Sequence, residues 1–287
     1  MRIAPGSPFG TEEIFLTPEV EAQLNATYGL DNPWYIQFKD YFFQILQGDL
    51  GRSMKYADRL TIDIIRDSFP ISLQLTAQSL ALALGLGTVL GVYGAAKAGG
   101  WLSQTLILST LLMISVPSFI VASLLQYVFG LKLGWLPISG WRLLGASVLP
   151  TLALGLTYAG NISRLVRSNA LVESRQAYVD LAKAKGLSQS RILFGHILRN
   201  AYRPVLAYLG PCVSGLLIGG FVVENLFAIP GLGTHLVNSI HHRDYPVIMG
   251  LTIFYSLVLL LSVLASDLLT GYLYPWMFKE ETDHESL

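Results

Sequence analysis

The sequence predicts an all-α, polytopic membrane helical bundle, because its composition is apolar and it contains five long runs without charge. Hydrophobic residues make up 52% of the 287 residues and charged residues only 13%, whereas soluble globular domains carry about 25% charged residues. The mean hydropathy of +0.51 agrees. A helix needs roughly 20 apolar residues to cross a bilayer core of about 30 Å. Charge-free runs of that length lie at residues 71–96, 98–131, 143–163, 204–223 and 245–266.

Composition and motifs argue against several classes of function. The formal net charge is +0, and a nucleic-acid partner would require a clustered basic surface. Cys212 is the only cysteine, so neither a disulfide framework nor a cysteine-based metal site can form. The chain contains no Gly-x4-Gly-Lys-Ser/Thr, His-Glu-x-x-His or Gly-x-Ser-x-Gly motif. We therefore expect no catalytic residue, metal or cofactor, and active transport would need energy from a partner or an ion gradient.

Basic residues between the third and fourth runs set the expected orientation. Residues 164–203 carry an excess of Arg and Lys, which only Glu173 and Asp180 oppose. Such a bias marks loops on the cytoplasmic side of a membrane. Because successive spans cross the membrane in opposite directions, we expect an outer segment at 1–69, a membrane domain at 70–275 and a cytoplasmic tail at 276–287. The basic residues are Arg164, Arg167, Arg175, Lys183, Lys185, Arg191, Arg199 and Arg203.

The outer N-terminal segment is long and polar, and it has no apolar run that could carry it across a membrane. We therefore expect a preceding transmembrane helix, which would bring the number of spans to six. Within the segment, residues 34–46 predict a helix with Tyr35, Phe38, Tyr41 and Phe42 at helical spacing. These aromatic side chains suit packing against the membrane domain or its lipid surface better than a ligand site.

The basic loop contains a predicted short helix between two turns. Residues 177–185 are good helix formers, and Gly186 is placed to end the helix after Lys183 and Lys185, whose charges suit a helix C-terminus. Ser188 can cap a second helix that follows. Two interpretations stay open on the residues alone. The short helix either transmits force from a partner protein that binds it, or lies on the membrane surface, where anionic lipid holds its basic residues.

The stretch from Asp180 to Gly186 resembles the Glu-Ala-Ala-x-x-x-Gly motif of bacterial ABC importer permeases. Ala182 and Gly186 match the motif, whereas Asp180 stands for its Glu and Leu181 for its first Ala. The later Ile-x-Leu-Pro part is blurred, and the Leu-Arg-Asn-Ala at 198–201 is similar to the peptide/nickel branch, closest to oligopeptide permease B subunits. Further similar stretches extend the resemblance over essentially the whole chain, at 2–9, 134–137, 223–227, 229–233 and 238–246.

The resemblance implies a type I ABC importer transmembrane domain in the bacterial cytoplasmic (inner) membrane. It implies a permease subunit that forms the translocation path for oligopeptides or dipeptides and is not itself an enzyme. The implied partners are a second homologous permease subunit, two cytoplasmic ATPase subunits, an extracytoplasmic solute-binding protein, the peptide substrate and membrane lipid. The loop helix would couple to an ATPase through Tyr178, Asp180, Leu181, Ala182, Lys185 and Gly186.

Other cargoes and another energy source stay open. Nickel or another small solute is an alternative cargo within the same branch. A secondary transporter driven by protons or sodium is a different class. It would favour paired acids within the spans and an internal repeat, and the five runs show neither.

The predicted outer loop between the last two runs supplies a second set of candidates. Residues 229–233 have the proline and glycines of a structural turn. The neighbouring His241 and His242 make a poor metal site, because adjacent helical residues point apart. We expect contact with the solute-binding protein or a place at the pore mouth for the set as a whole, which is Glu224, Pro230, Gly231, Gly233, Arg243 and Asp244.

Overall fold

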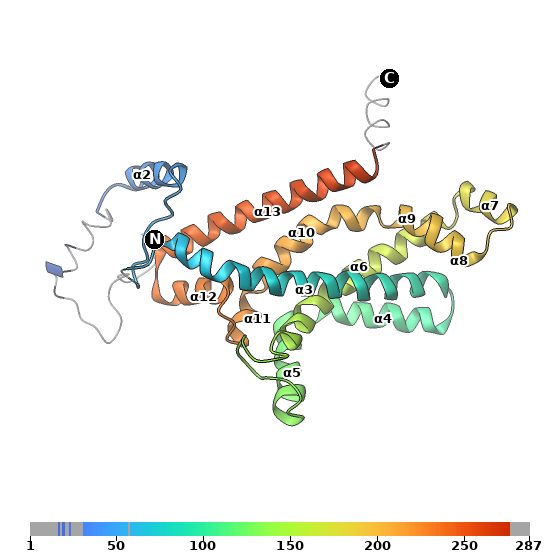
Figure 1. Cartoon of the computed structure of the whole chain (residues 1–287), viewed down its shortest axis with the longest axis horizontal. Coiled ribbons are helices and arrows are strands. Elements are labelled where there is room, and N and C mark those ends of the chain that lie inside the picture. The colour runs from blue at the N-terminus through green and yellow to red at the C-terminus, as the bar shows by residue number, and fades with distance from the viewer. Residues whose placement is uncertain (1–16, 18, 21–22, 24–30, 57, 276–287) are drawn as a thin grey trace, which may run out of the picture.

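The computed structural model describes residues 17, 19–20, 23, 31–56 and 58–275, which are mostly helical. Figure 1 shows long helices side by side along one axis, with short helices at both ends. The stretch at 2–9 and the tail at 276–287 lie outside the described residues. The described helices are α2 (Trp34–Leu46), α3 (Thr61–Ala96), α4 (Trp101–Ser115), α5 (Ser118–Leu125), the π-helical η1 (Gln126–Lys132), α6 (Val148–Glu173), α7 (Ala177–Ala184), α8 (Gln189–Ile192), the π-helical η2 (Leu193–Ile197), α9 (Leu198–Ala201), α10 (Arg203–Gly219), α11 (Phe221–Leu226), α12 (Leu232–His242) and α13 (Tyr245–Leu273).

Within the described residues, three helical stretches are long and apolar enough to cross a membrane: Thr61–Ala96, Arg203–Leu226 and Tyr245–Leu273. The bent pair formed by α4 with α5 and η1 is a fourth candidate. Four of the five predicted runs fall on these stretches. The remaining run falls on α6, whose 26 residues give it a length of about 39 Å. Polar residues make α6 less apolar than the other spans, so the predicted count of five depends on this helix.

The predicted second span is bent. α4 and the stretch from Ser118 to Lys132 meet at an angle of 98°. Pro117 explains the break, because the residue before a proline is pushed out of the helical region. Val116 is extended there, with φ −87° and ψ 122°. The run of apolar residues continues on both sides of the bend and so did not predict it.

α3 and α6 run in parallel and form the central helix pair of the bundle. α3 begins at Thr61 and continues through Pro70, so the predicted boundary between residues 69 and 70 falls inside this helix. Two glycines of α3 allow its backbone to approach that of α6. A Cβ atom on Gly87 would lie 2.7 Å from the carbonyl oxygen of Ala159, and one on Gly91 would lie 2.8 Å from that of Ser163.

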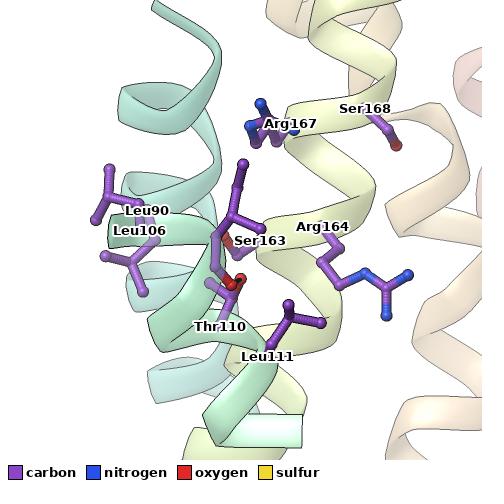
Figure 2. Close-up of a pocket in the computed structure, with 9 residues that line it drawn as sticks. Leu90, Leu106, Thr110, Leu111, Ser163, Arg164, Arg167 and Ser168 are labelled. Carbon is purple, nitrogen blue, oxygen red and sulfur yellow. Dashed lines mark hydrogen bonds between the residues drawn. The ribbon is translucent and has the colours of Figure 1, made fainter. Parts of the chain in front are cut away.

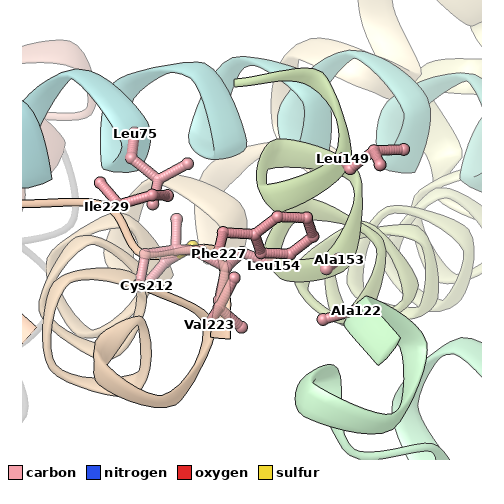
Figure 3. Packing of buried hydrophobic residues seen from close by; sticks show 10 residues of the cluster. Leu75, Ala122, Leu149, Ala153, Leu154, Cys212, Val223, Phe227 and Ile229 are labelled. Atoms are coloured by element: carbon pink, nitrogen blue, oxygen red, sulfur yellow. The ribbon is translucent and has the colours of Figure 1, made fainter. Parts of the chain in front are cut away.

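The most extensive buried cluster joins α3, α5, α6, α10 and α11 (Figure 3). Phe227, the residue after α11, is 1% exposed and packs among aliphatic side chains from the other helices. This core connects the bent pair to the central pair. Its members are Leu75, Ala122, Leu149, Ala153, Leu154, Cys212, Leu216, Val223, Phe227 and Ile229.

α2 stands apart from the bundle in Figure 1, and none of its residues is buried. Its predicted bounds agree with the observed ones. Tyr35, Phe38 and Phe42 are 58%, 67% and 50% exposed. The fourth predicted aromatic residue, Tyr41, is half-buried, and contact of the other three rings with the lipid surface stays a prediction.

Candidate functional site

The two predicted sets of residues lie at opposite ends of the bundle. Figure 1 shows α7 and α8 at one end of the long axis and α12 at the other. α13 ends near α9 at the α7 end, where the hydroxyl of Tyr274 donates a hydrogen bond to the carbonyl of Arg199. This arrangement is compatible with α7 on one side of a membrane and α12 on the other.

α7 presents one face to its own chain and the other to solvent. Val179 and Ala182 are 1% and 6% exposed, and they pack with buried residues of α6, α8, η2 and α9. Leu181, on the opposite face, is 58% exposed. Asp180 pairs with Lys183 at 2.9 Å, but both side chains are exposed and such pairs add little stability. The exposed face is therefore the side of α7 that is free to contact another protein.

Gly186 ends α7 in the left-handed conformation, with φ +75°. Its N–H donates to the carbonyl of Lys183 at 2.9 Å, and the N–H of Leu187 donates to that of Ala182 at 3.3 Å. These two bonds form a Schellman motif, in which glycine adopts the left-handed region without steric cost. The predicted helix end at Gly186 is confirmed. Ser188 also caps α8 as predicted, since its side chain accepts the N–H of Arg191.

Tyr178 connects α7 to the end of α6. Its hydroxyl donates a hydrogen bond to Oε2 of Glu173 at 2.7 Å. Burial, followed by this hydrogen bond, raises the pKa of Tyr178 above its usual value, so the hydroxyl remains a donor. Tyr178 and Ala182 thus face their own chain, and the small side chain of Ala182 serves packing there. The other predicted coupling residues are exposed, namely Asp180, Leu181, Lys185 and Gly186.

At the other end of the bundle, the side chain of Glu224 holds the start of α12. This residue is 2% exposed, and its Oε2 accepts the N–H of Gly233 at 2.7 Å. Ser72 of α3 accepts the N–H of Leu232 at 2.8 Å and hydrogen-bonds Glu224. These N–H groups lie in the first turn of α12, where they have no partner within the helix. A carboxylate also suits the positive end of a helix.

Gly231 and Gly233 allow this close approach. A Cβ atom on Gly231 would lie 2.6 Å from Oγ of Ser72, and one on Gly233 would lie 2.8 Å from Cβ of Phe221. Pro230, by contrast, is exposed. The predicted turn at 229–233 is therefore present, and its glycines are packed against α3 and α11.

Asp244 ties the N-terminal segment to the corner between α12 and α13. It is 2% exposed, it accepts the hydroxyl of Ser53, and it accepts the N–H of Met54 at 3.0 Å. Arg243 precedes it in the left-handed conformation, with φ 56°, which costs a non-glycine residue about 1 kcal/mol. Asp244 thus anchors a segment that precedes the bundle, whereas Arg243 is half-buried at the end of α12.

Two serines that complete this end of the bundle were not among the predicted residues. Ser53 lies 191 positions from Asp244, and Ser72 lies 160 positions from Leu232. Ser53 belongs to no motif or periodic pattern. Ser72 falls in a row of small residues at helical spacing in α3, with Ser68 and Thr76, but this row marks a packed face and does not indicate the bond to α12.

A comparison with known families decides where the chain belongs. The profile described as "Binding-protein-dependent transport system inner membrane component" matches residues 87–279. The chain belongs to this family. It is an inner-membrane component of a binding-protein-dependent transport system, and it works with a substrate-binding protein and an ATPase.

Relatives of this inner-membrane component match nearly its whole length. The "Dipeptide transport system permease protein DppB" of Bacillus subtilis (strain 168) is 41% identical over 96% of this chain and 89% of its own length. The "Oligopeptide transport system permease protein OppB" of Haemophilus influenzae is 37% identical over 96% of this chain and 90% of its own. The OppB of Salmonella typhimurium is 40% identical over 88% and 83%, respectively.

Solved structures of transporters share the fold of this inner-membrane component. A chain of the inward-facing MetNI methionine ABC transporter aligns with a TM-score of 0.62 and 18% identity, over 74% of this chain and 97% of its own. An amino acid ABC transporter solved with histidines aligns with a TM-score of 0.59 and 13% identity, over 74% and 94%. The predicted fold class, a type I ABC importer transmembrane domain, is confirmed.

Proposed function

We propose that the chain is a permease subunit that forms, with a second homologous permease subunit, a translocation path for oligopeptides and dipeptides. The observation that carries this proposal is the extent of the similarity to permeases named for dipeptides and oligopeptides, which reaches from the N-terminal segment through α13. Two separate cytoplasmic ATPase subunits supply the energy, and an extracytoplasmic solute-binding protein delivers the peptide.

α7 is the element that an ATPase subunit contacts in this proposal. Its inner face is fixed through Val179 and Ala182 to the ends of α6 and α9, and the bond from Tyr178 to Glu173 adds a second attachment. A displacement of α7 therefore passes into α6, and through α9 into α10. Closure of two ATPase subunits would in this way tilt the long helices of two permease subunits relative to each other.

The corner of α11, α12 and the start of α13 is the proposed contact for the solute-binding protein. Glu224 and Asp244 act there as positioning residues, because both are buried and hold backbone groups. The exposed Pro230 and the half-buried Arg243 are left as the surface members of the set. The N-terminal segment lies on the same outer side, and the tail at 276–287 on the cytoplasmic side.

Uptake in cells tests the proposal. The gene is deleted and restored, and uptake of labelled di-, tri- and pentapeptides and of nickel is measured in parallel. We expect loss of peptide uptake on deletion and its return on complementation, with nickel uptake unchanged. Loss of nickel uptake with intact peptide uptake would assign a metal cargo instead, and no change for any cargo would contradict both assignments.

A further inference from the structure

α6 has two opposite faces of different chemistry. Ala159, Ile162, Val166 and Ala170 are at most 1% exposed and form its packed side. The opposite side carries polar residues at spacings of four, three and four, which is the helical repeat. We call these residues the polar stripe, and it extends over roughly 16 Å of helix. Its members are Thr157, Asn161, Arg164 and Ser168.

Arg164 is the charged member of the polar stripe. It is exposed, and no described residue forms a hydrogen bond or an ion pair with its guanidinium. Figure 2 shows Arg164 and Ser168 on the side of α6 that is turned away from α4, while Arg167 lies toward α4. Arg167 is engaged there, because its Nε donates to the carbonyl of Gly94 at 3.2 Å. The two arginines of α6 are therefore in different environments.

Three of the four residues of the polar stripe line a recess between α6 and α10. The recess has a volume of about 320 Å³ and is lined by Asn161, Arg164, Leu165, Ser168 and Tyr208. A second recess, of about 310 Å³, lies on the other side of Arg164, against α3 and α4. Both volumes are at the lower end of the range of small-molecule sites.

The polar stripe extends into the depth of the bundle. Ser163, next to Arg164, lies beside Gly91 of α3. Lys97, at the end of α3, lies six residues beyond Gly91, or about 9 Å along the helix axis. Thr157 lies deeper still, and its hydroxyl oxygen is buried without a hydrogen-bond partner among the described residues. Ionisable residues at such positions in membrane proteins face a water-filled path or a partner.

We propose that the polar stripe of α6 lines the translocation path and that the guanidinium of Arg164 binds the C-terminal carboxylate of the peptide in transit. This inference rests on the proposed function. Arginine forms two parallel hydrogen bonds with a carboxylate. Because every linear peptide with a free C-terminus carries this group, the contact suits a path that takes peptides of different sequence. Asn161 and Ser168 flank Arg164 with neutral polar groups, each already bonded within the chain, Asn161 to Tyr208 and Ser168 to the carbonyl of Leu165.

The test compares a labelled tripeptide with its C-terminal amide in proteoliposomes that contain the complete transporter. Calorimetry first shows that both peptides bind the solute-binding protein. Each peptide is then used at a concentration that saturates the solute-binding protein. With Arg164→Gln, we expect uptake of the free acid to fall about tenfold or more, since a charge-assisted contact is lost. Uptake of the amide should change by less than about threefold, and Arg164→Lys should restore part of the uptake of the acid.

Arg142→Gln is the matched control, because it also removes one exposed arginine but lies outside α6. Equal loss of acid and amide with Arg164→Gln would show that Arg164 contacts the second permease subunit or lipid, and would overturn the inference. Unchanged uptake of both would overturn it as well. Uptake by the wild-type transporter distinguishes failure of this inference from failure of the proposed function. If the proposed function is wrong, the wild-type transporter takes up neither peptide.

Discussion

The side chain of Glu224 and the backbone N–H of Gly233 are joined by a hydrogen bond of 2.7 Å between α11 and the first turn of α12. Ser72 brings α3 to the same point through its bond to the N–H of Leu232. A Cβ atom on Gly231 would not fit between these side chains. These hydrogen bonds therefore join α3, α11 and α12 at one corner of the bundle.

Replacement of Glu224 by leucine should destabilise the protein. The N–H of Gly233 would be left buried without its acceptor, which costs about 1–3 kcal/mol. The expected result is a lower melting temperature of the purified protein in nanodiscs. Glu224→Gln is the control, because its amide oxygen can still accept the bond and the loss should be smaller. A melting temperature of Glu224→Leu equal to that of the wild type would show that this bond does not hold the corner.

Local signals in the sequence predicted the local structure. The helix at 34–46 has the bounds of α2, and Gly186 and Ser188 delimit the turn between α7 and α8. Each of these features depends on residues within about one helical turn. The same reasoning located the basic loop between two long helices.

Long-range contacts were not predictable in this way. The bond between Ser53 and Asp244 joins residues 191 positions apart, and no periodic pattern marks it. The inward position of Ala182 depends on the residues of α6, η2 and α9 that cover it. The candidate residues were thus found by type and motif, while the division into buried positioning residues and exposed contact residues required the fold.

Gly186→Val should uncouple transport while the protein still inserts into the membrane. A β-branched residue at φ +75° is strained by about 1–2 kcal/mol, and the space around it is open, so the change is confined to the end of α7. We expect ATP-driven peptide uptake to fall about tenfold or more, with the amount of protein in the membrane unchanged. Gly186→Asn should retain more uptake, because asparagine tolerates the left-handed conformation. Normal uptake by the valine variant would rule out a coupling role for this turn.

His235 should make stability sensitive to acid. Burial, together with the charge of Arg59, lowers the pKa of His235, and Asp67 opposes this in part. The unfolded chain therefore takes up a proton on this residue at higher pH than the folded protein does. The neutral His235 therefore costs the folded protein no stability above about pH 6.5. Below that pH the free energy of unfolding decreases, by at most about 1.4 kcal/mol per pH unit.

Melting temperatures at pH 7.5 and 5.5 check this prediction. The difference between the two should be smaller in His235→Gln than in the wild type. His241→Gln is the matched control, since it removes an exposed histidine of the same helix and should leave the difference unchanged. An undiminished difference in His235→Gln would assign the acid sensitivity to another group.

Leu181→Glu should weaken binding of the ATPase without affecting the fold. The side chain is 58% exposed on the outer face of α7, so the stability of the subunit should change by less than about 0.5 kcal/mol. A new charge in an apolar contact would have to be desolvated. We therefore expect the amount of ATPase that copurifies with the permease to fall severalfold, together with peptide uptake.

Val172→Glu is the matched control, because Val172 in the last turn of α6 is also 58% exposed at the same end of the bundle. If α7 is the contact, ATPase retention should respond to the substitution at position 181 and much less to that at 172. Equal loss in both variants would point to a broad surface rather than to α7. Full retention in both would mean that the ATPase contacts the chain elsewhere, because a charge at the centre of a docked helix cannot be accommodated without loss of apolar contact.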